Sequence, residues 1–370
     1  MRSKKSDYPL AVSLFLLIFA GIFILASVSA VLSQEKFGYP TYYLVHQIVY
    51  GVIIGLVLGF IAFKIPMDFF RKWALLIFVM NLVLVALVFI PKIGIHSGGA
   101  SRWLAFGSMS FQPAELLKIT FIIYLAAWLA AFAEKADSRK KKEKKSNVIL
   151  GAFLVIMACL SALLIAQPNV GTLGILFGIA LLMYFGSGNP IWHLGLIAGI
   201  GFATLAILIR IAPYRLQRFL VFANPDLDPL GMGYQMKQAL IAVGSGGIVG
   251  VGLGLSRQKF GFLPQSLGDS IFAIFAEEAG FIGALILISL FLFFIWRGIS
   301  VSKNSTDKFS QLVCLGIISW IGFQAFVNIG AMIGILPLTG IPLPFVSYGG
   351  SHVIAELIGA GLLLNISKNT

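Results

Sequence analysis

The chain has 370 residues, of which 59% are hydrophobic and only 11% are charged, and its formal net charge is +13. Soluble domains carry about 25% charged residues, so this composition excludes a soluble globular enzyme. The excess of basic residues would suit nucleic-acid binding, but their distribution along the chain indicates a membrane protein with no nucleic-acid partner.

Long apolar runs dominate the chain. Runs of about 18 or more apolar residues are typical of transmembrane helices, and ten runs follow one another, the sixth and tenth being short: Leu10–Leu32, Leu44–Phe63, Trp73–Ile90, Ala114–Phe132, Val148–Ala166, Gly171–Phe185, Ile191–Ile211, Ile271–Trp296, Leu312–Ala331 and Ser351–Ile366. We therefore predict an all-α integral membrane protein, a bundle of ten transmembrane helices that forms a single domain over residues 1–370. The first run is longer than a usual signal core, which favours an uncleaved anchor.

The basic residues gather in alternate connections. With a cytoplasmic N-terminus, the short outer loops hold only Lys36, Lys92 and Arg102, and most other Lys and Arg residues outside the long connection 212–270 fall inside. This asymmetry follows the positive-inside rule and predicts that both termini are cytoplasmic. We expect the cluster at 139–145 to be a solvated loop beside anionic lipid.

Two connections on the predicted outer side are long, 91–113 and 212–270. Loops of this length are usually functional or disordered. The second holds the apolar stretch Ala239–Val243 between polar and glycine-rich segments. Because a disordered loop would not contain so many apolar residues, we expect it to be partly helical and packed on the outer mouth of the bundle. Its glycines alone are a weak indication of phosphate binding, since the Lys-Ser/Thr of a P-loop is missing.

Carboxylates at membrane depth are costly and usually functional. Eight acids fall on the outer side or within the membrane: Glu35, Glu115, Asp226, Asp228, Asp269, Glu277, Glu278 and Glu356. Asp269 comes directly before the predicted eighth helix, so it is either a helix cap or a general base that points into a cleft, and the two roles are compatible. The helix dipole would keep it ionised.

Glu115 and Lys118 lie three residues apart at the start of the predicted fourth helix and share one of its faces. They form either a structural ion pair or the lining of a polar cavity in which Lys118 meets an anionic headgroup. Six basic residues lie in or beside the long connection: Arg210, Arg215, Arg218, Lys237, Arg257 and Lys259. They either extend to lipid headgroups or bind a diphosphate, for which Arg offers a bidentate fork.

Cysteine and histidine give no sign of a metal site. Cys159 and Cys314 fall in separate predicted helices, and the four histidines have no ligand-like spacing. We predict neither a disulfide nor a structural zinc site.

Several strings of the chain resemble the SEDS family (shape, elongation, division and sporulation). They include Phe111–Lys118, Gly231–Gln235, Ile241–Gly247, Asp269–Ala273 and Leu336–Pro344. The resemblance runs from the first predicted helix to the last and is closer to the FtsW branch than to the RodA branch.

The resemblance implies a peptidoglycan glycosyltransferase in the bacterial cytoplasmic membrane, which polymerises lipid II at the outer face. Asp269 would be the general base of an inverting displacement of undecaprenyl diphosphate. The residues expected to bind substrate are Arg102, Glu115, Lys118, Arg218, Lys237, Gln238 and Lys259. The expected partners are a class B penicillin-binding protein transpeptidase and other divisome or elongasome membrane proteins. No cofactor is predicted, and the need for a divalent cation stays open.

Four positions depart from the family pattern. Asn169 and Gln265 stand where acids are usual, and Leu267 and Gly268 precede Asp269 where the family has histidine and threonine. Both amides keep hydrogen bonding but lose charge, which puts a metal or charge-pair role there in doubt. A non-catalytic divisome scaffold therefore remains an alternative to the enzyme. A lipid II flippase is a second alternative, because ten helices with Glu115 and Glu356 in the bundle and broken apolar segments also fit a transporter.

Overall fold

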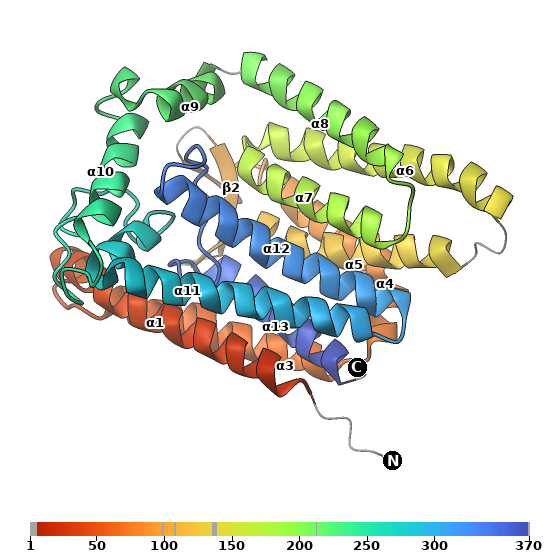
Figure 1. Ribbon diagram of the computed structural model, residues 1–370, viewed down its shortest axis with the longest axis horizontal. Coiled ribbons are helices and arrows are strands. Elements are labelled where there is room, and N and C mark those ends of the chain that lie inside the picture. Colours follow the sequence, from red (N-terminus) through yellow and green to blue (C-terminus); the bar gives the residue numbers. More distant parts are fainter. Residues whose placement is uncertain (1–5, 98–99, 107–108, 135–138, 212, 369–370) are drawn as a thin grey trace.

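The computed structural model describes residues 6–97, 100–106, 109–134, 139–211 and 213–368. Long helices run side by side through most of the molecule (Figure 1). Their bounds are α1 (Tyr8–Phe37), α2 (Tyr42–Gln47), the π-helix η1 (Ile48–Ile53), α3 (Ile54–Lys64), α4 (Met67–Leu87), α5 (Pro113–Glu134), α6 (Arg139–Ala166), α7 (Val170–Gly186), α8 (Trp192–Ile211), α9 (Pro213–Ala223), the 3-10 helix η2 (Pro225–Leu227), α10 (Met232–Ser245), α11 (Ile271–Asn304), α12 (Lys308–Met332) and α13 (Gly350–Ser367).

The chain is a multi-pass membrane protein. Eight helical segments of the described residues are long and apolar enough to cross a membrane, and Val170–Gly186 and Trp192–Thr204 are shorter apolar helices. These two coincide with the sixth and seventh predicted spans, so the count of ten spans stays a prediction. α6 begins at Arg139, so the backbone of the basic cluster is helical where we expected a loop. The side chains of 139–145 lie outside the described residues.

Contacts between distant parts of the chain hold the bundle together. α13 packs chiefly on α3, α11 packs on α12 and α1, and α4 packs on α5. The first and last described segments meet at one end of the bundle, where the backbone N–H of Asp7 donates to Ser367 Oγ at 3.1 Å. Asp7 also caps α1 by accepting from Leu10 N at 2.9 Å and pairs with Arg297 of α11. The opposite end of the bundle carries α9 and α10 (Figure 1).

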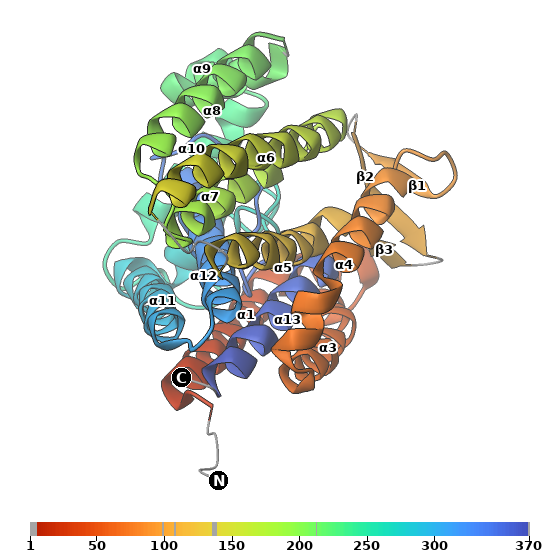
Figure 2. The ribbon, with the colours of Figure 1, turned by 90° about the vertical axis from the view of Figure 1, so that its right-hand side faces the viewer.

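A small sheet adds to the helical fold that we predicted. Strands β1 (Gly94–Ser97), β2 (Ala100–Phe106) and β3 (Met109–Phe111) form an antiparallel sheet in the order β1-β2-β3. The sheet lies at the periphery, next to α4 (Figure 2). It occupies part of the connection 91–113, and Arg102 of β2 joins it to the turn before α7.

The connection 212–270 is partly helical, as predicted. It contains α9, η2 and α10, and then continues without regular helix to Ser270. α10 runs across the end of the bundle, at a steep angle to α11 and α12 (Figure 1). The apolar stretch Ala239–Val243 forms the middle of α10, and Ala239 and Ala242 are fully buried there.

A break in α11 receives part of this connection. Gly280 adopts φ 66° and ψ −168°, a conformation that residues with a Cβ rarely reach. The break frees backbone groups on both sides: the Glu277 carbonyl accepts from Val251 N at 3.0 Å, and Phe281 N donates to the Gly247 carbonyl at 2.9 Å. The glycine-rich segment of the connection is thereby hydrogen-bonded into the helix.

Candidate active site

Asp269 lies in the turn that leads into α11. The residue that caps α11 is Ser270, which makes no side-chain capping bond, so Asp269 is not the helix cap that we considered. The turn begins at Gln265, whose φ is 52°, and the Gln265 carbonyl accepts from Gly268 N at 2.9 Å and from Ser270 N at 3.3 Å. Gln265, one of the positions that depart from the family pattern, therefore shapes the turn through its backbone.

Three hydrogen bonds fix the Asp269 turn from the side of α12 and α13. Asn328 Nδ2 donates to the Asp269 carbonyl at 2.8 Å and to the Ile341 carbonyl at the same distance. Tyr348 N donates to the Leu267 carbonyl at 2.8 Å, and Ser347 Oγ donates to the Gly268 carbonyl at 2.7 Å. The aspartate is thus held by segments from the C-terminal third of the chain.

Gln47, the residue before the π-helix, holds the same segment from behind. Its Nε2 donates to the Ser347 carbonyl at 3.2 Å, and its Oε1 accepts from Gly349 N at 2.9 Å. π-Helical turns inside α-helices are frequent at functional sites. In this protein, η1 begins directly after Gln47. Gln47 holds the segment whose residues Ser347 and Tyr348 bond to Gly268 and Leu267.

The environment of Asp269 is poorly solvated. Burial raises the pKa of Asp269 from 3.8 to about 6, against the opposing effects of local hydrogen bonds, of the Arg218 charge and of a hydrogen bond from Gln235. We expected the helix dipole to favour the ionised form, but desolvation outweighs the favourable interactions. At neutral pH the carboxylate remains mostly ionised and is a stronger base than an exposed aspartate.

Arg218 faces Asp269 from α9. Its Nη1 donates to the carbonyls of Leu338 and Thr339 at 3.3 and 3.4 Å, so it bridges α9 and the proline-rich segment beside Asp269. Its Nε is buried and has no hydrogen-bond partner among the described residues. A guanidinium with a free N–H next to the catalytic candidate is suited to an anion.

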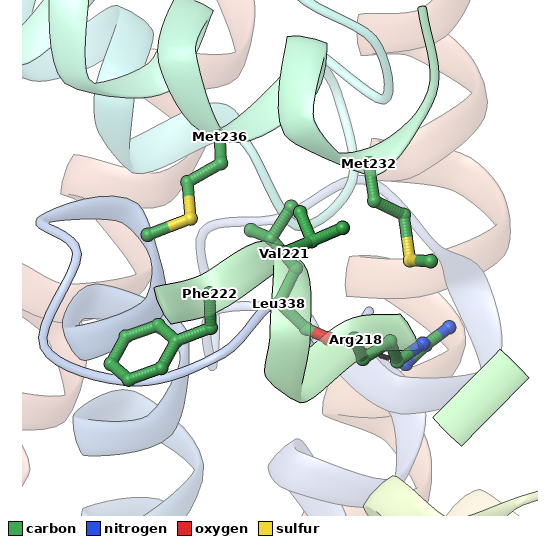
Figure 3. A pocket seen from close by; sticks show the side chains of 6 residues that line it. All are labelled: Arg218, Val221, Phe222, Met232, Met236 and Leu338. Atoms are coloured by element: carbon green, nitrogen blue, oxygen red, sulfur yellow. Dashed lines mark hydrogen bonds between the residues drawn. The ribbon is translucent and has the colours of Figure 1, made fainter. Parts of the chain in front are cut away.

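A shallow apolar crevice adjoins Arg218, and in this structure it has no enclosed space large enough for a water molecule. Met232 and Met236 reach into it from α10, whereas Val221 and Phe222 come from α9 and Leu338 from the facing segment (Figure 3). The guanidinium of Arg218 lies at its edge. The crevice therefore combines an apolar wall with one cationic group.

Lys237 and Gln238 lie on α10, and the structure brings them to the same end of the bundle as Asp269. Lys237 pairs with Asp226, and both side chains are exposed, at 41% and 77%. Exposed ion pairs contribute little to stability, so Lys237 is available to another anion. Gln235, three residues before Gln238, donates to Ser270 Oγ at 3.1 Å and joins α10 to the Asp269 turn.

Glu115 and Lys118 form a buried ion pair. Lys118 Nζ lies 2.8 Å from Glu115 Oε2 and donates to Gln324 Oε1, also at 2.8 Å. Gln324 Nε2 in turn donates to the Pro342 carbonyl at 3.1 Å and to Glu356 Oε1 at 3.3 Å. Lys118 is only 2% exposed. This arrangement favours the structural ion pair over a lysine that is free to meet a headgroup.

Lys259 is also enclosed, because its Nζ lies 2.9 Å from Glu278 Oε1 and the two side chains are 3% and 1% exposed. Glu277 accepts from the backbone N–H of Arg257 at 3.1 Å and from Ser256 Oγ. The two glutamates therefore hold the segment 256–259 against α11, and neither is a free base.

Arg102 lies on β2, and its Nε donates to the Gln167 carbonyl at 3.2 Å, while Nη2 donates to the Pro168 carbonyl. It thus braces the turn before α7, which Asn169 caps by accepting from Thr172 N at 3.4 Å. The structure brings Asp269, Arg218, Lys237 and Gln238 to one region, whereas Arg102, Glu115, Lys118 and Lys259 serve separate contacts. No group of three or more His, Cys, Asp or Glu side chains that could hold a metal occurs among the described residues.

The sequence alone predicts no role for Gln47, Gln235, Asn328, Ser347 or Tyr348. Gln235 lies in Gly231–Gln235, one of the strings that resemble the SEDS family. A buried amide at membrane depth was the available signal for Asn328, which is 1% exposed. The contacts of Gln47 depend on a π-helix, for which the sequence holds no periodic signal.

The sequence of the chain matches a known protein family. The family model described as "Cell cycle protein" and named for FtsW, RodA and SpoVE matches residues 8–370. The chain is 37% identical to Stage V sporulation protein E of Bacillus subtilis (strain 168), over 100% of this chain and 99% of that protein. It is also 37% identical to the probable peptidoglycan glycosyltransferase FtsW of Geobacter metallireducens, over 94% of this chain and 90% of that protein.

Solved structures have the same fold. A chain from a peptidoglycan synthase complex, studied for its structural coordination of polymerization and crosslinking, superposes with a TM-score of 0.78 at 26% identity and covers 98% of this chain and 97% of its own length. The rod shape determining protein RodA of Thermus thermophilus superposes with a TM-score of 0.70 at 24% identity, over 98% of this chain and 96% of its own.

Proposed function

Because the chain belongs to the FtsW/RodA/SpoVE family of cell cycle proteins, we propose that it is a peptidoglycan glycosyltransferase that polymerises lipid II into glycan strands. The observation that carries the proposal is the Asp269 turn: a poorly solvated carboxylate on a turn that is held by hydrogen bonds from α12 and from the segment before α13, with the Arg218 charge acting on it. Relatives that align over nearly the whole chain bear the name peptidoglycan glycosyltransferase, which supports the same activity.

In the proposed reaction, a sugar hydroxyl of one lipid-linked substrate attacks the anomeric carbon of another. Asp269 takes the hydroxyl proton as the new C–O bond forms, since a neutral hydroxyl is a poor nucleophile without a base in reach. The bond to undecaprenyl diphosphate breaks, and the diphosphate leaves with the electron pair. A single displacement inverts the anomeric centre, and no second carboxylate is required because the leaving group needs no proton.

Cations stabilise the charge of the departing diphosphate. Arg218 is our first candidate, because its Nε is buried without a partner among the described residues. Lys237 is the second, because its ion pair is exposed. We assign positioning roles to Arg102, Glu115, Lys118 and Lys259, whose polar groups are engaged in the contacts described above.

We further propose that the protein lies in the bacterial cytoplasmic membrane as one domain, with both termini inside and the Asp269 end of the bundle outside. The basic residues of the connections support this orientation. Its proposed partners are a class B penicillin-binding protein transpeptidase and other divisome or elongasome membrane proteins. The similarity to a chain of a peptidoglycan synthase complex supports the first of these.

The alternative of a lipid II flippase rests on the carboxylates inside the bundle. Glu115 is paired with Lys118, and Glu356 accepts from Phe345 N at 2.7 Å and from Gln324. These engaged carboxylates favour a structural role, so we do not propose transport. A non-catalytic divisome scaffold would not polymerise lipid II, whereas the enzyme would.

The test is polymerisation of lipid II by purified protein with its partner transpeptidase, comparing wild type with Asp269→Asn. The amide keeps the size of the side chain but has no proton acceptor of comparable basicity. We expect the initial rate to fall by about a hundredfold or more, the usual scale for loss of a general base. The thermal midpoint of unfolding should not fall, because the amide removes the cost of a poorly solvated charge.

Asp228→Asn is the matched control. Asp228 lies at the same end of the bundle, where its carboxylate accepts from Gly231 N and Met232 N at 3.1 and 2.9 Å. An asparagine keeps one of these two acceptor oxygens and Asp228 has no role in the proposed chemistry, so the polymerisation rate of the control should stay within about twofold of wild type. Wild-type rates from Asp269→Asn would overturn the base assignment, and an inactive wild-type protein would favour the scaffold.

A further inference from the structure

Aromatic rings gather beside the Asp269 turn, at the corner where α1 ends and α2 begins. We call the following seven side chains the aromatic shelf: Phe37, Tyr39, Tyr42, Tyr43, His46, Tyr50 and Tyr348. Phe37 and Tyr42 stack with centroids 3.6 Å apart and planes 15° apart, and Tyr43 meets Tyr348 edge-on at 5.0 Å. The rings thus form one continuous cluster.

The shelf is joined directly to the proposed catalytic turn. Tyr348 contributes its ring to the shelf, and its backbone N–H donates to the Leu267 carbonyl, two residues before Asp269. Its hydroxyl is hydrogen-bonded to His46 Nδ1 at 2.9 Å. A shift of Tyr348 would therefore displace both the shelf and the turn that carries Asp269.

Part of the shelf is open. Phe37, Tyr39 and Tyr50 are 41%, 49% and 37% exposed. Aromatic residues at membrane boundaries commonly form belts that face lipid, but belt residues need not contact one another. Here the rings pack face to face and edge to face in one patch, which gives a polarised aromatic surface with hydroxyl groups among it.

The charges around Asp269 are divided between two sides. Arg218 interacts with the Asp269 charge from α9, and Lys237 lies on neighbouring α10. The shelf holds neutral phenols and phenyls with a single imidazole, and the exposed Glu35 and Lys36 before it cancel in charge. A diphosphate belongs to the cationic side, whereas the faces of neutral sugar rings, with their partly positive C–H groups, suit the negative faces of aromatic rings.

We propose that the aromatic shelf is a carbohydrate subsite that binds N-acetylhexosamine rings of the growing glycan strand next to Asp269. This inference rests on the proposed function and deepens it, because it names where the sugar part of the substrate lies. By holding the strand between successive additions, the shelf would set the length of the product more than the rate of a single addition.

The test uses full-length protein in lipid nanodiscs with chitotetraose, a soluble neutral N-acetylhexosamine oligomer, as the probe. Saturation-transfer NMR should detect binding to wild type, and Tyr39→Leu combined with Tyr42→Leu should raise the Kd by about fivefold or more. In lipid II polymerisation the same variant should shorten the strands severalfold, while lipid II consumption stays within about threefold of wild type. If the double variant folds poorly, Tyr39→Leu alone replaces it in the test, because Tyr39 is exposed. This single variant should raise the Kd and shorten the strands by a smaller factor.

Phe15→Leu combined with Phe19→Leu is the matched control, because these exposed rings also stack, at 6.4 Å, in the middle of α1. The control should bind chitotetraose as wild type does. Absence of chitotetraose binding by wild type, or equal loss in the control, would overturn the proposal and leave a lipid-facing belt.

Asp269→Asn separates this inference from the proposed function. The variant should bind chitotetraose with the Kd of wild type, whether or not Asp269 is the base. If Asp269→Asn binds chitotetraose and polymerises lipid II as wild type does, only the assignment of Asp269 as the base is wrong. If Asp269→Asn loses polymerisation but wild type does not bind chitotetraose, only the carbohydrate subsite is wrong.

Discussion

Asp269 differs from the buried carboxylates around it in what it touches. Glu115, Glu278 and Glu277 each have a cation or a set of N–H and O–H donors. Asp269 has the more remote charge of Arg218 and the polar groups of its own turn and of Gln235, and these do not offset its desolvation. A carboxylate in this condition is poised to take a proton, which is why we assign the chemistry to this residue.

The raised pKa of Asp269 predicts the pH dependence of the reaction. The base is active when ionised, so the rate should be level above pH 7 and half-maximal near the pKa of about 6. At pH 5 about a tenth of the maximum should remain. Initial rates of lipid II polymerisation between pH 4.5 and 8.5 measure this limb.

The residual rate of Asp269→Asn serves as the control for that profile. It should lack the acidic limb, because the amide does not titrate. The same limb in both proteins would assign the titration to another group.

Lys118 tests whether the polar network inside the bundle is structural. Lys118→Met leaves Glu115 buried without a counter-charge and removes a donor from Gln324, so we expect a loss of about 3–5 kcal/mol in stability. The thermal midpoint and the yield of folded protein should fall with activity. Adding Glu115→Gln to Lys118→Met removes the stranded charge and should recover part of the midpoint. A variant with a wild-type midpoint and no polymerisation would restore the substrate-binding role that we predicted for Lys118.

At the scale of elements, the break in α11 organises the long connection. The segment 246–252 bonds to backbone groups that an unbroken helix would satisfy internally, and the side chains of Glu277 and Glu278 hold 256–259. Both anchors precede Asp269 in the chain by fewer than twenty-five residues. The turn at the head of α11 is therefore tied to the helix through the connection as well as through its own backbone.

Gly280→Ala tests the break. A Cβ on Gly280 would lie 2.2 Å from Gly250 N at a positive φ, so the segment 246–252 must detach or the helix must shift. We expect faster hydrogen exchange in 246–252 and a lower thermal midpoint. Gly244→Ala is the control, since a Cβ there meets nothing within 4 Å and alanine in a helix is favoured by about 1 kcal/mol. Unchanged exchange in Gly280→Ala would contradict the role of the break.

At the scale of the whole molecule, the orientation in the membrane is still to be measured. A reporter fused after Lys145 should read cytoplasmic, and one inserted near Asp226 should read extracytoplasmic, because basic connections remain inside. Reports from the same side would contradict the ten-helix topology.

Much of the architecture follows from hydropathy alone. The predicted span Leu312–Ala331 lies within α12, and Ile271–Trp296 lies within α11, because apolar length decides whether a segment crosses a membrane. The sheet β1–β3 was not predicted, since its short strands carry no strong alternation and satisfy one another only after the connection folds. Local sequence also left Lys118 and Lys259 open as phosphate ligands, because their partners Gln324 and Glu278 lie on distant or separate elements.

The candidate side chains of the site could be named from the sequence, whereas the contacts that hold them could not. Asp269 and Arg218 are candidates because of their residue type, their position at predicted boundaries and the family resemblance, and their roles stay predictions. Asn328 and Tyr348 hold the Asp269 turn through its backbone carbonyls, and Gln235 holds it through Ser270 Oγ. Such contacts arise only when separate segments meet. A sequence pattern reports which side chain carries charge, whereas the restraint on that side chain comes from the assembled bundle.

The π-helix η1 has a consequence for how this stretch tolerates changes in length. Each residue of an α-helix turns the chain by about 100°, and a π-helical turn accommodates one residue more than an α-helical turn. Deleting one residue between Ile48 and Ile53 would therefore convert η1 into an α-helical turn and leave Gln47 at nearly the same rotation relative to α3. Gln47 would then keep its hydrogen bonds to the carbonyl of Ser347 and the N–H of Gly349. A second deletion, or an insertion, would rotate Gln47 by about 100° and break both bonds, so this helix should tolerate the loss of one residue but not of two.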